Sequence, residues 1–284
     1  MTAATTPIVE AVDVEKTLGE GAGRVQALRG VSLALKGGEL TLLMGPSGSG
    51  KTTLLSILGG MLTPTRGTVR LAGETTTGAG PETLARLRRT HVGFVFQSYH
   101  LFPTLTAIEN VRLVLDVRGE HGEDAPERAA AALATVGLAH KHHAFPRELS
   151  GGEQQRVAIA RAVVGRTAAL FADEPTASLD GDNGRAIMTV LADIAKDPRR
   201  AVLVVTHDPR TLPFADRIVR IEDGRIVAEE AGAHAGPAPR EPAPNESASP
   251  KSVSPKSVSP ESVSPESVSP ESASPESQGS PHAP

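Results

Sequence analysis

The sequence predicts an α/β fold in which helices cover a mostly parallel sheet. Short apolar runs alternate with helical patterns from residue 40 to residue 221, and two runs of half-polar alternation precede them. A glycine-rich loop separates the first apolar run from the first helical pattern. Strands that alternate with helices are typical of parallel sheets, whereas half-polar runs are typical of antiparallel strands with one solvated face. The 284 residues suffice for one large domain or two small ones.

The individual elements follow this pattern in order. Half-polar runs at 9–14 and 31–35 predict an N-terminal antiparallel β-layer. Mostly apolar runs predict more buried strands at 40–44, 92–96, 169–172, 201–206 and 218–221. Helical patterns between them lie notably at 125–136, 153–164 and 184–196. The helix-rich stretch at about 98–164 predicts an inserted α-helical subdomain.

The glycine-rich loop matches the pattern G-x-x-x-x-G-K-[ST]. Its glycines let backbone N–H groups turn inward around phosphate oxygens, and the following helix directs its positive end toward them. Lys51 is expected to reach the β- and γ-phosphates, and the Thr52 hydroxyl to bind Mg²⁺. The candidate nucleotide ligands of this segment are Gly45, Pro46, Ser47, Gly48, Ser49, Gly50, Lys51, Thr52 and Thr53. The sequence therefore predicts a RecA-like P-loop NTPase fold that uses ATP and Mg²⁺.

Polar residues follow three other predicted strands at the points where those strands end. Asp173 and Glu174 follow one apolar run, His207 follows another and Gln97 a third. Because the carboxyl ends of parallel strands meet at one edge of a sheet, we expect these side chains to converge. Asp173 is expected to hold Mg²⁺, Glu174 to polarise the attacking water as general base, and His207 to contact the γ-phosphate. Gln97 is expected to sense the Mg²⁺ ion and the water.

A further segment has the pattern of a capped helix start. Ser150 is a favoured N-cap, and Gly151 and Gly152 permit close backbone approach before Glu153. Taken alone, this segment fits an ordinary helix start as well as a phosphate-binding device. Asp180 lies in a loop that follows the acidic pair.

Composition excludes several classes of function. The net charge of -4 argues against a nucleic-acid-binding surface, so no nucleic acid is expected as a partner. The absence of cysteine removes disulfides, thiolate nucleophiles and zinc–thiolate sites. No run approaches the ~18 apolar residues that cross a bilayer, and no signal peptide is visible. We therefore expect a cytoplasmic protein whose membrane role, if it has one, comes through a partner.

The folded part is expected to span residues 1–230. Beyond it the composition shifts to Pro, Ser, Ala, Glu and Lys, and from residue 251 a unit of the type Lys/Glu-Ser-Val-Ser-Pro repeats. A proline in every unit forbids a continuous helix, and one valine per unit cannot bury a core. Residues 231–284 are therefore predicted to form a disordered tail. It serves either as a solubilising extension or as a docking or phosphorylated segment.

Together these segments resemble the ATP-binding-cassette (ABC) ATPases. The matching motifs are the P-loop at 45–52, a Q-loop at Gln97, a signature at 149–154, a Walker B pair at 173–174, a D-loop at 178–180 and a switch histidine at His207. In that family two cassettes sandwich two ATP molecules head to tail, so the resemblance implies a homodimer with C₂ symmetry. It implies that Ser150 and Gly152 serve the γ-phosphate of the opposite protomer. It also places Gly151, Glu153 and Asp180 among the nucleotide-binding residues.

Within that family the chain is most similar to the lipoprotein- and macrolide-exporter group, including glycolipid-exporter cassettes of the DevA kind. The segments that carry this similarity lie at 25–32, 56–60, 105–111, 204–210 and 215–218. The similarity implies an integral-membrane permease as a separate partner, with a periplasmic adaptor as a further one. The cassette would then be peripheral on the inner face of the cell membrane and would power an exporter or a membrane-extraction system. The alternatives are an ATPase that regulates a membrane complex, such as a cell-division assembly, without transport, and a soluble ATPase acting on ribosomes or DNA.

Leu18 departs from the family pattern. The family usually stacks adenine on an aromatic side chain near this position, and leucine offers apolar contact without π-stacking. We therefore expect Leu18 to contact the base with weaker ATP affinity or looser base selectivity.

Two other segments attract attention for their side chains. His140, His142 and His143 have the composition of a metal site, but a solvated turn is the favoured interpretation. Residues 99–103 gather aromatic and histidine side chains just after Gln97, and the resemblance places the permease contact there.

Overall fold

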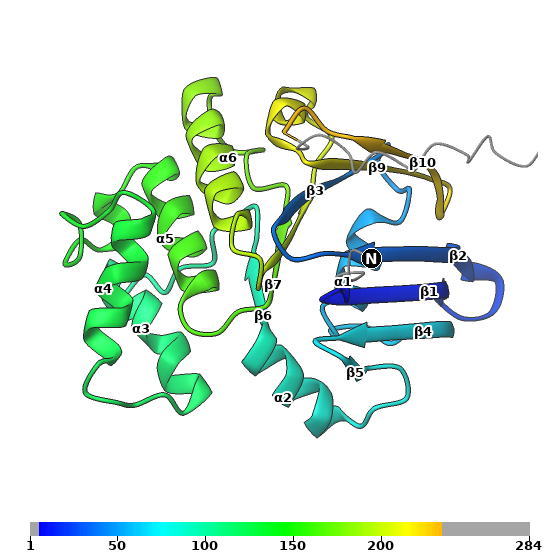
Figure 1. Ribbon diagram of the computed structural model, residues 1–284, viewed down its shortest axis with the longest axis horizontal. Coiled ribbons are helices and arrows are strands. Elements are labelled where there is room, and N and C mark those ends of the chain that lie inside the picture. Colours follow the sequence, from blue (N-terminus) through cyan, green and yellow to red (C-terminus); the bar gives the residue numbers. More distant parts are fainter. Residues whose placement is uncertain (1–5, 235–284) are drawn as a thin grey trace, which may run out of the picture. The chain divides into compact units, whose positions relative to one another are not determined.

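The computed structural model of the protein describes residues 6–234, which form two sheets and the helices around them (Figure 1). The first sheet is antiparallel throughout and has the strand order β2-β1-β4-β5. Its strands are β1 (Val9–Leu18), β2 (Val25–Leu35), β4 (Arg66–Leu71) and β5 (Glu74–Thr75). The predicted N-terminal β-layer is thus present.

The second sheet has the order β10-β9-β3-β8-β7-β6. Its strands are β3 (Glu39–Met44), β6 (Val92–Val95), β7 (Ala169–Asp173), β8 (Ala201–Val205), β9 (Arg217–Glu222) and β10 (Arg225–Ala231). Neighbouring strands from β9 to β6 are parallel, and β10 pairs antiparallel with β9 at the edge. The prediction of a mostly parallel sheet is confirmed.

The central strands are buried on both faces, and this explains why they read as unbroken apolar runs. In β3, Leu40 and Leu42 join the core that contains α-helical residues such as Leu115 and Ile159, whereas Leu43 joins the core between the two sheets. Helix α1 (Lys51–Leu58) contributes Leu54 to that second core. Figure 1 shows α1 lying between the two sheets, directly behind the loop that follows β3.

Most of the remaining helices cover the other face. The α-helices are α2 (Pro81–His91), α3 (Ala107–Arg118), α4 (Ala125–Thr135), α5 (Gly151–Val163) and α6 (Gly181–Ala195). Short 3₁₀ turns lie at η1 (Gly21–Gly23), η2 (Pro146–Glu148) and η3 (Pro209–Phe214). Helices α3, α4 and α5 contact one another, and α5 also contacts β6 and α6. In the described part of the chain, no helix is both long and apolar enough to cross a membrane.

The folded structure extends slightly beyond residue 230, the predicted end of the folded part. Strand β10 continues to Ala231 although its outer half is exposed, because it pairs with β9 along its whole length. Beyond it, the Gly232 amide donates to the Asp216 carbonyl at 2.8 Å and the His234 amide donates to the Ala215 carbonyl at 3.0 Å. Most of the predicted tail at 231–284 lies outside the described residues.

Candidate active site

The loop between β3 and α1 is shaped for a bound polyphosphate. Gly48 and Gly50 have φ values of +82° and +100°, which side chains other than glycine adopt only with strain. A Cβ atom on Gly50 would lie 2.6 Å from the Ala27 carbonyl oxygen, so glycine is required there for space as well. Helix α1 begins at Lys51, and its free N–H groups therefore face the concave side of the loop.

Lys51 lies across this loop. Its ammonium group donates to the carbonyl oxygens of Gly45 at 2.8 Å and Pro46 at 2.7 Å. The Ser49 hydroxyl is buried and has no hydrogen-bond partner within the described residues. Ser47 and Thr52 are exposed, and Thr53 is half-buried. A loop that holds one positive charge and leaves one buried hydroxyl unpaired is chemically matched to an anionic ligand.

The turn between β9 and β10 supports this loop, and the sequence analysis did not identify it. Gly224 donates its N–H to the Ser49 carbonyl at 3.0 Å and accepts the Arg29 N–H at 2.8 Å. Asp223 and Gly224 have φ values of 45° and 74°, as a type I′ hairpin turn requires. In the sequence, an Asp-Gly pair follows the predicted strand at 218–221, and such a pair is typical of a hairpin turn. No strand was predicted after this pair, so the hairpin was missed.

The acidic pair closes β7, the strand two places from β3 in the sheet. The Thr52 hydroxyl donates to Oδ2 of Asp173 at 3.4 Å. Burial raises the pKa of Asp173, and this outweighs the lowering by the Thr52 hydrogen bond. A carboxylate and a hydroxyl at this separation are the hard oxygen donors that Mg²⁺ uses beside phosphate oxygens and water. The residues present therefore fit a magnesium ion.

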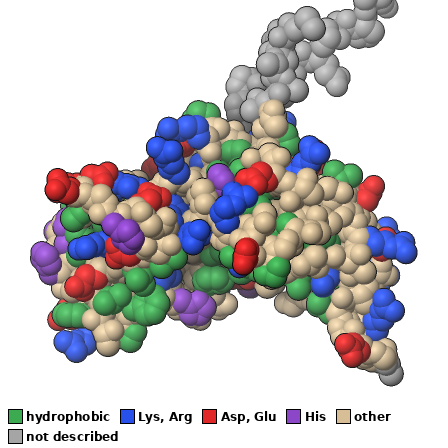
Figure 2. All heavy atoms as spheres, turned by 90° about the horizontal axis from the view of Figure 1, so that it is seen from below, with side chains coloured by type: hydrophobic (Ala, Val, Ile, Leu, Met, Phe, Trp, Pro, Cys, Tyr) green, Lys and Arg blue, Asp and Glu red, His purple; other side chains and the backbone are tan. Residues whose placement is uncertain are grey.

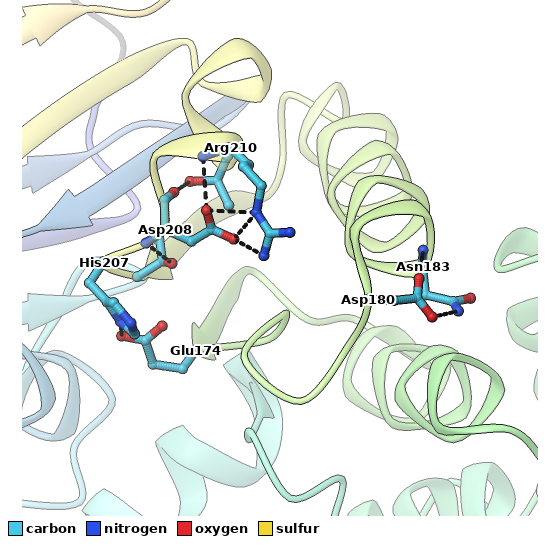
Figure 3. A network of polar contacts seen from close by, with 8 residues as sticks. Glu174, Asp180, Asn183, His207, Asp208 and Arg210 are labelled. Carbon is cyan, nitrogen blue, oxygen red and sulfur yellow. Dashed lines mark hydrogen bonds and ion pairs between the residues drawn. The ribbon is translucent and has the colours of Figure 1, made fainter.

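Glu174 and His207 face each other from neighbouring strands (Figure 3). His207 Nδ1 lies 2.7 Å from Glu174 Oε1, and the Glu174 backbone N–H donates to the Val205 carbonyl at 2.9 Å. Beside them, Asp208 forms an ion pair with Arg210 at 2.7 Å, and its carboxylate also accepts the Arg210 backbone N–H. The Arg210 hydrogen bond is the main reason that the pKa of Asp208 is lowered. These contacts fix the loop that carries His207.

Gln97 lies in the exposed turn after β6, the strand next to β7. The polar residues that follow β3, β8, β7 and β6 thus belong to four strands that are consecutive neighbours in the sheet. The structure brings together the phosphate loop, His207, the acidic pair and Gln97 at the carboxyl edge of the sheet, as the sequence analysis expected.

The Ser150 and Asp180 turns make local hydrogen bonds. The Ser150 N–H donates to Glu153 at 2.8 Å, and the Ser150 hydroxyl accepts the Glu153 N–H at 3.2 Å, which completes a capping box. The first of these bonds is the largest cause of a lowered pKa at Glu153. Asp180 caps α6 by accepting the Asn183 N–H at 2.9 Å, and that bond lowers the pKa of Asp180.

The two turns lie side by side. A Cβ atom on Gly152 would come 2.6 Å from Asn183 Oδ1, so a larger residue there would displace the Asn183 side chain. Gly151 lies beside Tyr99, whose hydroxyl would be 3.0 Å from a Cβ atom there. Figure 3 shows Asp180 and Asn183 well apart from Glu174 and His207. These residues therefore form a second group on the same chain.

A pocket of about 390 Å³ adjoins the phosphate loop, and this volume suits a small-molecule ligand. Gly48, Gly50, Lys51, Thr52 and Thr53 form one wall. The pocket is also lined by Leu18, Val25, Gln26, Ala27, Arg29, Asp223 and Gly224. Leu18 is 39% exposed at its rim. Leu18, the residue expected to contact the base, thus lines the pocket beside the phosphate loop and offers no aromatic ring.

The candidate metal cluster at 140–143 has no support. His142 and His143 meet edge to face at 6.5 Å between ring centroids. Across residues 6–234, no group of three His, Asp or Glu side chains is arranged to hold a metal ion.

A parallel sheet with a glycine-rich phosphate loop, an acidic pair and a histidine on one edge defines a P-loop nucleotide hydrolase. The chain belongs to the ABC transporter family, whose model matches residues 28–177. The resemblance seen in the sequence is therefore confirmed, and the protein is an ABC-type ATPase that binds and hydrolyses ATP.

Curated relatives place it near macrolide exporters. The macrolide export ATP-binding/permease protein MacB of Sodalis glossinidius is 42% identical over 225 residues, which cover 79% of this chain and 34% of that protein. MacB of Escherichia coli K12 is 40% identical over 222 residues, 78% of this chain and 34% of that protein. The chain thus spans about a third of the length of these relatives.

Solved structures show the same fold. The dimeric ATP-binding cassette MJ0796, in a post-hydrolysis state bound to ADP and Pi, is similar with a TM-score of 0.71 and 40% identity, over 78% of this chain and 98% of that one. The protein cbiO1 of Clostridium perfringens, part of the ABC transporter complex cbiONQ, is similar with a TM-score of 0.72 and 28% identity, over 80% of this chain and 89% of that one.

Proposed function

We propose that this ATPase powers a separate integral-membrane permease in an exporter or membrane-extraction system. The observation that carries this proposal is the identity of 42% to the ATP-binding part of a macrolide export protein. The cassette would act by closing on ATP and reopening after hydrolysis. It would lie in the cytoplasm, peripheral on the inner face of the membrane, with a periplasmic adaptor beyond the permease.

The positions of the site residues support a role for each of them. Residues 45–53 bind the phosphates, and Lys51 exchanges its two carbonyl partners for phosphate oxygens. Thr52 and Asp173 would hold Mg²⁺, with Gln97 as a further contact. When bound, the ion neutralises charge on the phosphate oxygens. Glu174 orients and deprotonates the attacking water, and His207 holds the Glu174 carboxylate and contacts the γ-phosphate.

The second group of residues is proposed to complete the site of another copy. Ser150, Gly151, Gly152, Glu153 and Asp180 lie at the starts of α5 and α6. At the start of α5, the N–H groups that the capping box does not use are available to a phosphate. Two copies arranged head to tail would bring this group onto the phosphate loop of the partner. MJ0796 is dimeric, which supports the same arrangement for this chain.

The permease is proposed to dock beside residues 99–103. Phe102 is 50% exposed there, although large apolar side chains are usually buried. Figure 2 shows hydrophobic side chains gathered on the surface at the helical side of the molecule. An exposed apolar surface of this kind favours contact with another protein.

The test is affinity purification of the Glu174→Gln variant with ATP from solubilised host membranes, followed by mass spectrometry. Recovery of a permease with a large outer domain supports the exporter proposal and gives access to its cargo. Recovery of a cell-division complex favours the regulatory alternative. A membrane partner is disfavoured if the cassette is recovered by itself. It is likewise disfavoured if the cassette is recovered together with ribosomes or with DNA.

A further inference from the structure

Helix α5 carries a fully buried glutamine, Gln155. Its side chain is 0% exposed, and its amide nitrogen donates to the Pro175 carbonyl at 2.8 Å. The same nitrogen lies 3.5 Å from the Phe96 carbonyl oxygen. Because both carbonyls are acceptors, the NH₂ group must face them, which fixes the orientation of the amide. The side chain thus joins α5 to two loops at the carboxyl edge of the sheet.

Both loops carry residues of the active site. Pro175 directly follows Glu174, and Phe96 directly precedes Gln97. Helix α5 itself begins at the Ser150 turn, which is proposed to bind the nucleotide of the opposite protomer. One amide group therefore connects three segments with separate roles in the reaction.

Stability does not explain a glutamine at this position. Its Oε1 atom is buried and has no hydrogen-bond partner within the described residues. An apolar side chain of similar size would remove the unpaired Oε1 atom but would leave the Pro175 carbonyl without its donor, so the two effects on stability oppose each other. Of the four such atoms in residues 6–234, one other lies in the phosphate loop, in Ser49, and the remaining two are in Thr176 and His142.

A second side chain of α5, Arg161, bonds to the segment just after Gln97. Arg161 donates to the Tyr99 carbonyl at 2.8 Å and to the His100 carbonyl. Tyr99 and His100 have φ values of 59° and 49°, a conformation that costs free energy in residues other than glycine. The segment around Gln97 is therefore held to α5 at both ends.

We propose that Gln155 is a positioning residue for ATP hydrolysis. It holds the loops that carry Glu174 and Gln97 in register with α5, so that a displacement of the Ser150 turn reaches the residues around the attacking water. This inference rests on the proposed function, since the roles of Glu174 and Gln97 belong to it.

The test uses Gln155→Leu in the full chain, with Thr76→Val as the matched control. Thr76 is a buried polar residue just after β5, away from the site, and its hydroxyl donates to the Val69 carbonyl at 3.2 Å. Gln155→Leu is expected to lower kcat by ~10- to 100-fold, because small displacements of catalytic groups have effects of that size. The KM for ATP and the unfolding midpoint of Gln155→Leu stay close to the wild type, and Thr76→Val keeps the wild-type kcat and KM.

A second variant, Gln155→Glu, separates positioning from packing. A protonated glutamic acid can still donate to Pro175, whereas its ionised form cannot, and burial raises the pKa of such a carboxyl. Its kcat relative to the wild type should therefore rise as the pH falls. Wild-type kcat in Gln155→Leu, or losses of kcat that only follow a lower unfolding midpoint, would overturn the inference. If Glu174→Gln is inactive while Gln155→Leu is fully active, this inference alone fails; if Glu174→Gln turns over normally, the proposed function fails.

Discussion

His207 Nδ1 and Glu174 Oε1 lie 2.7 Å apart, and they come from neighbouring parallel strands. Glu174 adopts a φ of 48°, a conformation that costs a non-glycine residue about 1–3 kcal/mol. Its backbone N–H bonds to Val205, two residues before His207. The Glu174 side chain is 18% exposed, whereas that of His207 is 69% exposed. The backbone of β8 and the imidazole together hold this carboxylate at the sheet edge, which is the position that a general base requires.

His207→Ala is expected to lower kcat by ~100-fold or more, because it removes the side chain that contacts Glu174, the proposed general base. ATP binding should change little, since the phosphate loop keeps its contacts. His121→Ala, which removes an exposed histidine after α3, is the matched control. Steady-state hydrolysis and equilibrium ATP binding measure both effects. Normal turnover in His207→Ala would contradict the account.

Asp173→Asn is expected to stabilise the nucleotide-free protein at neutral pH while abolishing Mg²⁺-dependent turnover. The folded-state pKa of Asp173 is raised above its usual 3.8. An acid with a raised pKa favours the folded state while it is protonated, and that contribution is lost as the pH rises through the folded pKa. The uncharged Asn avoids this loss, so the difference in unfolding midpoint should shrink as the pH falls toward about 4. Thermal unfolding across this range measures it, and a variant less stable than the wild type at neutral pH would contradict the assigned cause.

Leu18→Tyr is expected to tighten ATP binding, because a stacked ring adds ~0.5–1.5 kcal/mol over apolar contact alone. The dissociation constant should fall by roughly two- to tenfold. Val12→Tyr adds the same ring at an exposed position of β1 outside the pocket and serves as the control. Equal affinity of Leu18→Tyr and wild type would show that the base lies elsewhere.

Truncation after His234 is expected to leave ATP hydrolysis unchanged, whereas truncation after Val227 should reduce it. The shorter chain loses the pairs that Ala228, Glu229 and Glu230 make with β9. This loosens the hairpin whose Gly224 supports the phosphate loop. The rate of ATP hydrolysis and the unfolding midpoint of the two truncated chains measure this difference. Equal activity of both would mean that β10 has no role in holding the loop.

The sequence predicted those parts of the fold whose physical cause is local. Strands such as β8 read as apolar runs because both of their faces are buried, and the phosphate loop is marked by glycines that no other residue can replace. Strands β4 and β10 were missed because their exposed faces are polar. The contact of Gly152 with Asn183 could not be foreseen, because it depends on how α5 and α6 pack.

We propose that two copies of this chain enclose ATP and that Glu174 ends the enclosed state by hydrolysis. The most direct measurement is the molecular mass of the Glu174→Gln variant in solution with Mg²⁺ and ATP, with Mg²⁺ and ADP as the comparison. The account predicts the mass of two chains with ATP, that of one chain with ADP, and turnover lowered by at least ~100-fold. The mass of a single chain under both conditions, together with normal turnover, would contradict it.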